Sequence, residues 1–228
     1  MEPLGEKIAE GRDTEIYSHG PGKVIRIARS GRSLVGEAEL MSYVHSHGYP
    51  VPEVHDAGEG YLVMDLVEGP TMIQHALPFG IRAAAKMLAE LHQQLHRIEA
   101  PHSLKEEAGI AGDKVLHGDL HPLNVLISPE GPVVIDWSNA CRGDPAFDLA
   151  DTWVLFACAD PPMGHLEKLV VPVAKRLFLG SFLGSVDRTS AEGAVPAAVE
   201  RRIADPNMSD REKERMRAMA QRASRRLS

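Results

Sequence analysis

Short apolar runs separated by turn residues dominate the first third of the chain. β-Branched and aromatic residues alternate there with polar ones, which is the pattern of half-buried strands. The predicted strands are residues 7–9, 14–17, 24–28 and a run that begins at Tyr61 and ends in a turn at Gly69. A helix is predicted over residues 33–47, where the apolar positions are Leu34, Leu40, Met41 and Val44. This part of the chain therefore predicts a small sheet with one helix.

The remaining two thirds of the chain have a mainly helical pattern. The clearest helix is residues 81–98, in which the apolar repeat is Met87, Leu88, Leu91 and Leu95. Short apolar runs predict strands at residues 115–116, 125–127 and 133–135. Further helices are expected at residues 150–159, at 166–183 with breaks at Pro172 and Gly180, and after the capping box formed by Ser209 and Glu212. The pattern as a whole predicts an α+β fold.

Composition narrows the class of protein. The chain has 228 residues, of which 43% are hydrophobic, an ordinary value for a soluble globular protein. No apolar run is long enough to span a bilayer, and the N-terminal residues lack the pattern of a signal peptide, so a cytoplasmic protein with no membrane partner is expected. Cys141 and Cys158 are too few for a disulfide framework, although one pair could form.

The charge distribution argues against a nucleic-acid partner. The net charge is −7 at pH 7. Residues 200–228 carry a local charge of +4, which leaves −11 for residues 1–199. The basic tail is most simply a solvated helix with a charged face, and a basic docking patch is the less favoured alternative.

Three polar residues carry the chemical signal of the sequence. Asp119 and Asn124 lie in a loop between two predicted strands, and Asp136 follows the β-branched run at residues 133–135. An Asp can accept the proton of an attacking hydroxyl, an Asn five residues later can ligate Mg²⁺, and a second Asp can hold Mg²⁺ against nucleotide phosphates. A lone Asp136 would be a turn former. With Asp119 and Asn124 at this spacing, the three residues predict a phosphoryl-transfer centre.

Other catalytic sites fit the sequence less well. The stretch Gly118-Asp119-Leu120-His121 is similar to a fragment of a dinuclear metallophosphoesterase, but the upstream Asp-x-His and the Gly-Asn-His of such a site are missing. No Gly-x-x-x-x-Gly-Lys-Ser/Thr motif is present, which excludes a P-loop kinase at motif level. His92 and His96 share a helix face and could bind a metal, but without a third ligand at a fixed spacing we expect packed or surface histidines.

Two stretches resemble the aminoglycoside phosphotransferase and choline kinase family. They are His117-Gly118-Asp119-Leu120-His121-Pro122-Leu123-Asn124 and the segment from Ile135-Asp136-Trp137 to Gly143-Asp144-Pro145-Ala146-Phe147-Asp148-Leu149-Ala150. The resemblance is strongest over residues 115–151, continues over about residues 5–100 and fades after residue 160. It implies a bilobal protein-kinase-like fold. The N-lobe would be residues 1–69, with a hinge at about 64–69, and the C-lobe residues 70–228.

The resemblance also implies how the N-lobe would hold a nucleotide. Arg26 corresponds to the strand cation that binds the α- and β-phosphates, in place of the family's usual lysine, and Val24 lies near the adenine. Lys23 is the less favoured cation because strand alternation points it to the opposite face. Glu37 matches the helix glutamate that pairs with this cation, and Glu39 is the alternative.

At the expected hinge, the resemblance places Asp65 and Leu66, whose backbone would hydrogen-bond the adenine. In the C-lobe it implies that His117 braces the catalytic loop and that His121 lies near the phosphates. Asp144 and Asp148 would stabilise the loops behind the catalytic centre, with helix capping as the alternative role.

The expected activity is transfer of the γ-phosphoryl group of ATP or GTP to a hydroxyl of a small molecule, with Asp119 as catalytic base and Mg²⁺ on Asn124 and Asp136. An amino sugar, an aminoglycoside or an amino alcohol is the expected acceptor, because an acidic site focuses cations. Only 77 residues follow Asp151, which is short for the family and argues against antibiotic acceptors. The alternatives are a primitive Ser/Thr protein kinase and a non-catalytic nucleotide-binding module.

Overall fold

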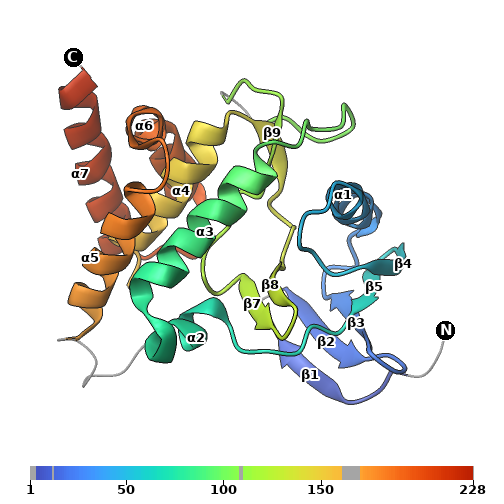
Figure 1. The fold of residues 1–228 in the computed structure, drawn as a ribbon. Coiled ribbons are helices and arrows are strands. Elements are labelled where there is room, and N and C mark those ends of the chain that lie inside the picture. Colours follow the sequence, from blue (N-terminus) through green and yellow to red (C-terminus); the bar gives the residue numbers. More distant parts are fainter. Residues whose placement is uncertain (1–3, 12, 108–109, 161–169, 228) are drawn as a thin grey trace. The chain divides into compact units, whose positions relative to one another are not determined.

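The computed structural model describes residues 4–11, 13–107, 110–160 and 170–227, which form two compact units (Figure 1). The first unit comprises residues 1–71 and 124–138, and the second comprises residues 72–123 and 139–228. The segment 124–138 therefore folds with the N-terminal sheet, whereas the expected lobe boundary after residue 69 assigned it to the C-lobe. That lobe boundary stays a prediction.

A five-stranded antiparallel sheet with the order β1-β2-β3-β5-β4 is the frame of the first unit. Its strands are β1 (Lys7–Glu10), β2 (Thr14–Ser18), β3 (Lys23–Ala28), β4 (Val54–Gly58) and β5 (Tyr61–Asp65). The four strands predicted from the sequence are confirmed. The sequence did not predict β4, because the adjacent polar residues His55 and Asp56 interrupt the apolar pattern there.

One helix and one hairpin complete the first unit. Helix α1 (Val35–Ser46) buries the apolar positions that its spacing predicted, namely Leu34 just before it and Leu40, Met41 and Val44 within it. Strands β7 (Val125–Ser128) and β8 (Gly131–Val134) pair antiparallel around the turn that joins them. The loop after β8 packs its indole, Trp137, edge-on against Tyr49 with 5.6 Å between the ring centroids. This packing fixes the backbone next to Asp136.

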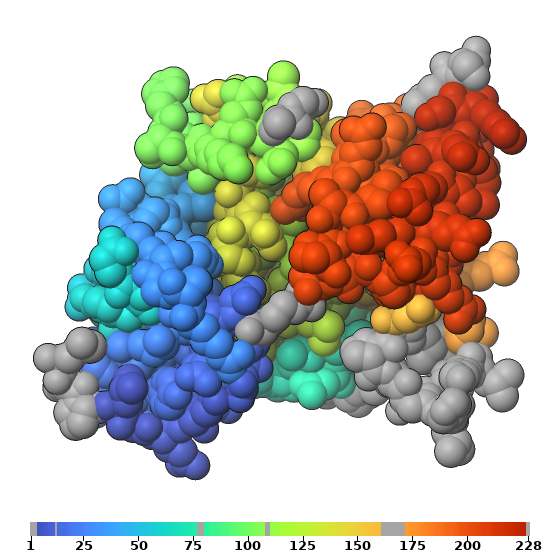
Figure 2. Space-filling model, turned by 180° about the vertical axis from the view of Figure 1, so that it is seen from behind, coloured from blue at the N-terminus to red at the C-terminus, as the bar shows by residue number. Residues whose placement is uncertain are grey.

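The second unit is mainly helical, as the sequence predicted. Its elements are α2 (Met72–Phe79), α3 (Ile81–Leu95), β6 (Lys114–Leu116), β9 (Cys141–Gly143), α4 (Pro145–Cys158), α5 (Val170–Leu183), α6 (Arg188–Ala204) and α7 (Asp210–Leu227). Helix α4 packs on α6, and α6 packs on α7. Helices α6 and α7 form the dark orange and red surface in Figure 2. The shared core includes Phe147, Ala150 and Val154 of α4, Val195, Ala198 and Val199 of α6, and Met216 and Ala223 of α7.

Two helix predictions need correction. Helix α4 begins at Pro145 rather than at residue 150, because Asp144 caps it and proline suits the first turn of a helix. Helix α5 runs through both Pro172 and Gly180, where breaks were expected. Pro172 lies in the first turn, where an amide has no intrahelical partner to lose, and Gly180 weakens a helix without ending it. Residues 166–169 of that prediction lie outside the described residues.

Of the two C-terminal helices, the sequence predicted α7 but not α6. The capping box of α7 is confirmed, since Ser209 N–H donates to Glu212 Oε2 at 2.9 Å and Glu212 N–H donates to Ser209 Oγ at 3.3 Å. Helix α6 was not predicted, because Pro196 within it and its weak apolar periodicity hide the pattern. None of the described helices is both long enough and apolar enough to cross a membrane.

Candidate functional site

Asp136 occupies a strained turn of the first unit. Strand β8 ends at Val134, so Asp136 lies two residues beyond the strand instead of directly at its end. Its φ of 63° is the only positive φ of a non-glycine residue in the described part of the chain. A left-handed backbone costs such a residue about 1–2 kcal/mol. The Ile135 N–H donates to the Asn124 carbonyl at 3.0 Å, so the backbone joins the segments of the two candidate metal ligands.

The carboxylate of Asp136 is accessible. Its side chain is 49% exposed. Ser138 Oγ donates to Asp136 Oδ1 at 2.8 Å and so fixes one of the two oxygens. Strained backbone geometry concentrates at functional sites, where the surrounding structure holds it. The geometry presents a fixed, reachable carboxylate next to the loop that carries Asn124.

Arg26 and Glu37 form a buried ion pair in the same unit. Arg26 lies on the central strand β3, opposite Ile16 and Leu62, and Glu37 lies in the first turn of α1. Their side chains are only 6% and 5% exposed, and Arg26 Nη2 contacts Glu37 Oε2. A buried charge without its partner is strongly destabilising, so each side chain requires the other.

Both charges of this pair have a second neighbour. Arg26 Nη1 lies 3.8 Å from Asp136 Oδ1, and Arg32 Nη2 lies 3.6 Å from Glu37 Oε2. Arg26 therefore stands between Glu37 and Asp136, on the strand position that the sequence singled out. Glu39, the alternative partner, is exposed on α1.

The remaining nucleotide-site candidates of the first unit lie on β3 and after β5. Val24 is buried and paired with Met64. Asp65 ends β5, and its Oδ1 lies 2.6 Å from His55 Nε2. The Asp65 N–H donates to the Glu53 carbonyl at 3.0 Å, and the Leu66 N–H donates to the Gly22 carbonyl at 2.9 Å. A contact of these two residues with adenine would therefore use a group other than their amides.

Asp119 belongs to the second unit, where two side chains hold its carboxylate. Arg202 Nη2 donates to Asp119 Oδ1 at 2.6 Å, and His121 Nε2 lies 3.5 Å from Asp119 Oδ2. Burial by itself raises the pKa of Asp119, but the interactions with His121 and Arg202 outweigh burial and hold this pKa well below its usual value. Asp119 is therefore a carboxylate at neutral pH, the form that can accept a proton.

The backbone before Asp119 is tightly enclosed. Gly118 has a φ of 73°, and a Cβ on it would lie 2.5 Å from the Asn139 carbonyl oxygen, so only glycine fits. Asp148 of α4 accepts the His117 N–H at 3.1 Å and the Gly118 N–H at 2.9 Å. The structural role expected for Asp148 is confirmed by these bonds, and the capping role of Asp144 by its 2.8 Å bond from the Ala146 N–H.

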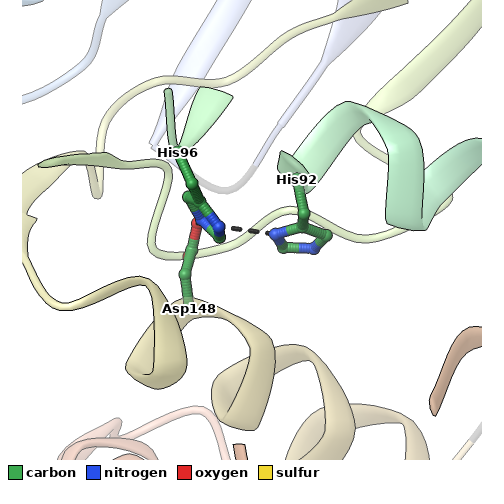
Figure 3. A group of neighbouring side chains, drawn as sticks. All are labelled: His92, His96 and Asp148. Carbon is green, nitrogen blue, oxygen red and sulfur yellow. Dashed lines mark hydrogen bonds and ion pairs between the residues drawn. The ribbon is translucent and has the colours of Figure 1, made fainter. Parts of the chain in front are cut away.

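His92 of α3 and His96, the residue that follows the end of this helix, meet the Asp148 carboxylate in a buried cluster (Figure 3). His96 Nε2 lies 3.1 Å and His92 Nδ1 3.6 Å from Asp148 Oδ2, and Thr152 Oγ1 lies 3.2 Å from His92 Nε2. Burial opposes ionisation of Asp148, but the two imidazoles hold its pKa well below the usual value. The pKa of His96 is lowered, mainly by burial.

Asp148 supplies the third potential ligand that the sequence lacked. One ligand-type atom from each of the three residues lies within 4.8 Å of the others. The carboxylate, however, already accepts two backbone N–H groups, and the imidazole beside it can donate a further hydrogen bond. These donors satisfy the buried charge without a metal. The cluster is best explained as hydrogen-bonded bracing of the loop that carries Asp119.

Asp151, Arg201 and Arg202 are site residues that sequence reasoning missed. Asp151 lies one turn after Asp148 on α4 and is fully buried, and burial raises its pKa. Arg202 Nε donates to Asp151 Oδ1 at 2.8 Å, and Arg201 Nη1 donates to the Gly118 carbonyl at 2.6 Å. A charged residue on the apolar side of a predicted helix was the available signal for Asp151. Nothing in the sequence indicated its partners, which lie 51 residues away in the case of Arg202.

Comparison with known proteins gives matches over much of this chain. The sequence model of the phosphotransferase enzyme family matches residues 5–110 and 113–171. An aminoglycoside 3′-phosphotransferase of Streptomyces ribosidificus is 26% identical over 166 residues. That match covers 50% of this chain and 63% of the relative, so it spans less than two thirds of the relative's length.

Solved structures share the fold. A gentamicin complex of APH(2″)-IIa has a TM-score of 0.64 at 16% identity, covering 99% of this chain and 91% of that one. A choline/ethanolamine kinase family protein from Mesorhizobium loti has a TM-score of 0.58 at 14% identity, covering 99% and 88%. The predicted kinase-like α+β fold is confirmed by this likeness. Since the family's sequence model also spans both units and both motif stretches, the chain belongs to the phosphotransferase enzyme family.

Proposed function

We propose that this protein transfers the γ-phosphoryl group of ATP or GTP to a hydroxyl group of a small molecule. One observation carries the proposal: Arg26, held by Glu37 in a buried pair, also faces the exposed carboxylate of Asp136. A structural salt bridge needs only two partners. Binding of a nucleotide phosphate through a metal ion requires a carboxylate for the metal and a cation for the phosphate, and Asp136 and Arg26 supply this combination.

Within the first unit, Asn124 and Asp136 would hold Mg²⁺. Both offer oxygen donors, the ligands that Mg²⁺ prefers, and the half-exposed Asp136 leaves room for water and phosphate oxygens. Bound there, Mg²⁺ would neutralise negative charge on the phosphates. Arg26 would bind phosphate oxygens and Val24 would contact the adenine. Asp65, Leu66 and His121 keep the nucleotide-site roles that the family resemblance implies.

Asp119 would act as the base of the reaction. It is ionised at neutral pH, and the bracing of Gly118 and His117 fixes the loop that carries it. Positioning matters because phosphoryl transfer depends on alignment and electrostatic stabilisation more than on covalent help from the protein.

The acceptor is proposed to be an amino sugar, an aminoglycoside or an amino alcohol. The name of the Streptomyces relative and the gentamicin complex of a structural neighbour support this class. The charge of −11 over residues 1–199 would also favour a cationic acceptor. A cytoplasmic location and the absence of a nucleic-acid partner stay predictions.

The test is a screen for triphosphate consumption with hydroxylated metabolites, aminoglycosides and generic proteins as acceptors. We expect transfer to one class of small molecule, with Asp119→Asn retaining Mg·nucleotide binding but losing about 10²–10⁴ in turnover, the usual contribution of a general base. Transfer to proteins alone would favour a protein kinase. No transfer to any acceptor, with biological activity unaffected by Asp119→Asn, would favour a nucleotide-binding module.

A further inference from the structure

Arg202 is a buried cation that the phosphotransferase motif does not use. It lies on α6, 83 residues after Asp119, and its side chain is only 9% exposed. Its Nε donates to Asp151 Oδ1 at 2.8 Å, and its Nη2 contacts Asp151 Oδ2 and donates to Asp119 Oδ1 at 2.6 Å. The guanidinium of Arg202 therefore binds Asp151 through two nitrogens and donates a further N–H to Asp119.

Asp151 fixes the direction in which this guanidinium points. It is fully buried on α4 and also lies 3.4 Å from Arg201 Nη1. A bidentate carboxylate holds a guanidinium in one plane, which a single hydrogen bond does not do. The contact from Arg202 to Asp119 is therefore set by α4 and α6, and not by the catalytic loop itself.

Helices α4 and α6 together hold the loop 117–119 at its backbone N–H groups, at a backbone carbonyl and at the Asp119 side chain. Asp148 of α4 binds the backbone N–H groups of His117 and Gly118, and Arg201 of α6 binds the Gly118 carbonyl. Arg202 adds the only one of these contacts that reaches the reacting side chain. Among the described residues, the titratable and charged groups that act on Asp119 include His121 from its own loop, Arg202 from α6 and Asp151 from α4.

We propose that Arg202 is a positioning residue for Asp119, because it holds the carboxylate that acts as the base in one orientation. Arg202 binds Oδ1, while His121 Nε2 lies 3.5 Å from Oδ2. In the transfer step the acceptor O–H bond breaks and its proton goes to the Asp119 carboxylate. The acceptor oxygen bonds to the γ-phosphorus, and the nucleoside diphosphate leaves with the electron pair of the broken P–O bond. This inference rests on the proposed function of Asp119.

Two variants separate positioning from simple stability. Arg202→Lys keeps the charge but not the planar fork, so Asp119 should lose its fixed orientation. We expect kcat to fall about tenfold to a hundredfold, because small misplacements of reacting groups cause losses of this size. The nucleotide KM should be unchanged. Arg202→Gln alone would leave the buried carboxylate of Asp151 without its main counter-charge. The double variant Asp151→Asn with Arg202→Gln removes one buried charge of each sign, so it should fold.

In the folded double variant, the pH at which kcat/KM falls on the acid side of its pH profile should rise by about 1–3 units. An arginine beside a carboxylate usually lowers the carboxylate pKa by this amount, so its removal should raise the pKa. A helix-stabilising role alone would not move the acid side of the profile. Arg226→Lys, in an exposed pair with Glu192 on another helix, serves as the control and should leave kcat and the pH profile unchanged. Wild-type kcat and an unchanged pH profile in both Arg202 variants would overturn the proposal, as would an Arg202→Lys variant faster than wild type.

A second measurement does not depend on activity. Carbon-13 NMR of the Asp119 carboxyl should show its pKa raised by about 1–3 units in the double variant relative to wild type. An unchanged carboxyl titration would overturn the inference. If wild-type protein transferred phosphate to no acceptor, the proposed function would fail, while this titration would still decide whether Arg202 controls Asp119.

Discussion

The buried pair of Arg26 and Glu37 gives the sharpest prediction about the first unit. Glu37→Gln keeps the size of the side chain but leaves Arg26 without its main counter-charge. Removing one partner of a buried pair costs about 3–5 kcal/mol. Arg26 retains Asp136 at 3.8 Å, so the lower end, about 3 kcal/mol of unfolding free energy, is expected. Arg32 adds little to the loss because its side chain is 44% exposed.

The matched control is Glu39→Gln. Glu39 lies on the same helix and is exposed, so its loss should change the unfolding free energy by less than about 0.5 kcal/mol. The assay is urea unfolding followed by tryptophan fluorescence in a Trp153→Phe background. There Trp137, which is 2% exposed in the first unit, is the only reporter.

Glu37→Gln has a second consequence, for ligand binding. Without Glu37, Arg26 is drawn to Asp136 and competes with Mg²⁺, so Mg·nucleotide affinity should also fall. Equal unfolding midpoints for the two glutamate variants would refute the reasoning, because they would mean that the burial of Glu37 carries no electrostatic cost.

Three further predictions address the metal ligand Asp136, the phosphate-binding Arg26 and the contact of Asp148 with the loop before Asp119. Asp136→Ala should weaken Mg·nucleotide binding, and equal affinities by calorimetry with an intact fold would remove Asp136 from the site. Arg26→Ala should raise the nucleotide KM and lower turnover while Lys23→Ala does little; the opposite ranking in steady-state kinetics would contradict the strand assignment. Asp148→Asn should lower the unfolding free energy by about 1.5–3 kcal/mol at pH 7, the usual contribution of hydrogen bonds to a charged group. Because the folded pKa of Asp148 is depressed, this difference should be full above the unfolded pKa of about 3.9 and shrink as the pH falls further, which denaturation at several pH values would check.

Local signals in the sequence determined much of the fold. The strands at the start of the chain, helix α3, the hairpin β7–β8 and the capping box of α7 follow from periodicity and turn chemistry over a few neighbouring residues. The spacing of Asp119, Asn124 and Asp136 is also a local signal, because only the short hairpin β7–β8 separates Asn124 from Asp136. Strand β4 and helix α6 were missed since their patterns are interrupted, and packing against neighbouring elements stabilises them.

Only the tertiary structure decided which charges meet. Glu37 and Asp148 were visible as candidates, but their burial and their partners depend on how α1, α3 and α4 pack. The contact between Arg202 and Asp119 joins residues 83 positions apart, and no periodicity reaches that far. A sequence fixes which side chains carry charge, whereas the desolvation that makes a pair essential arises only when packing removes water from both partners.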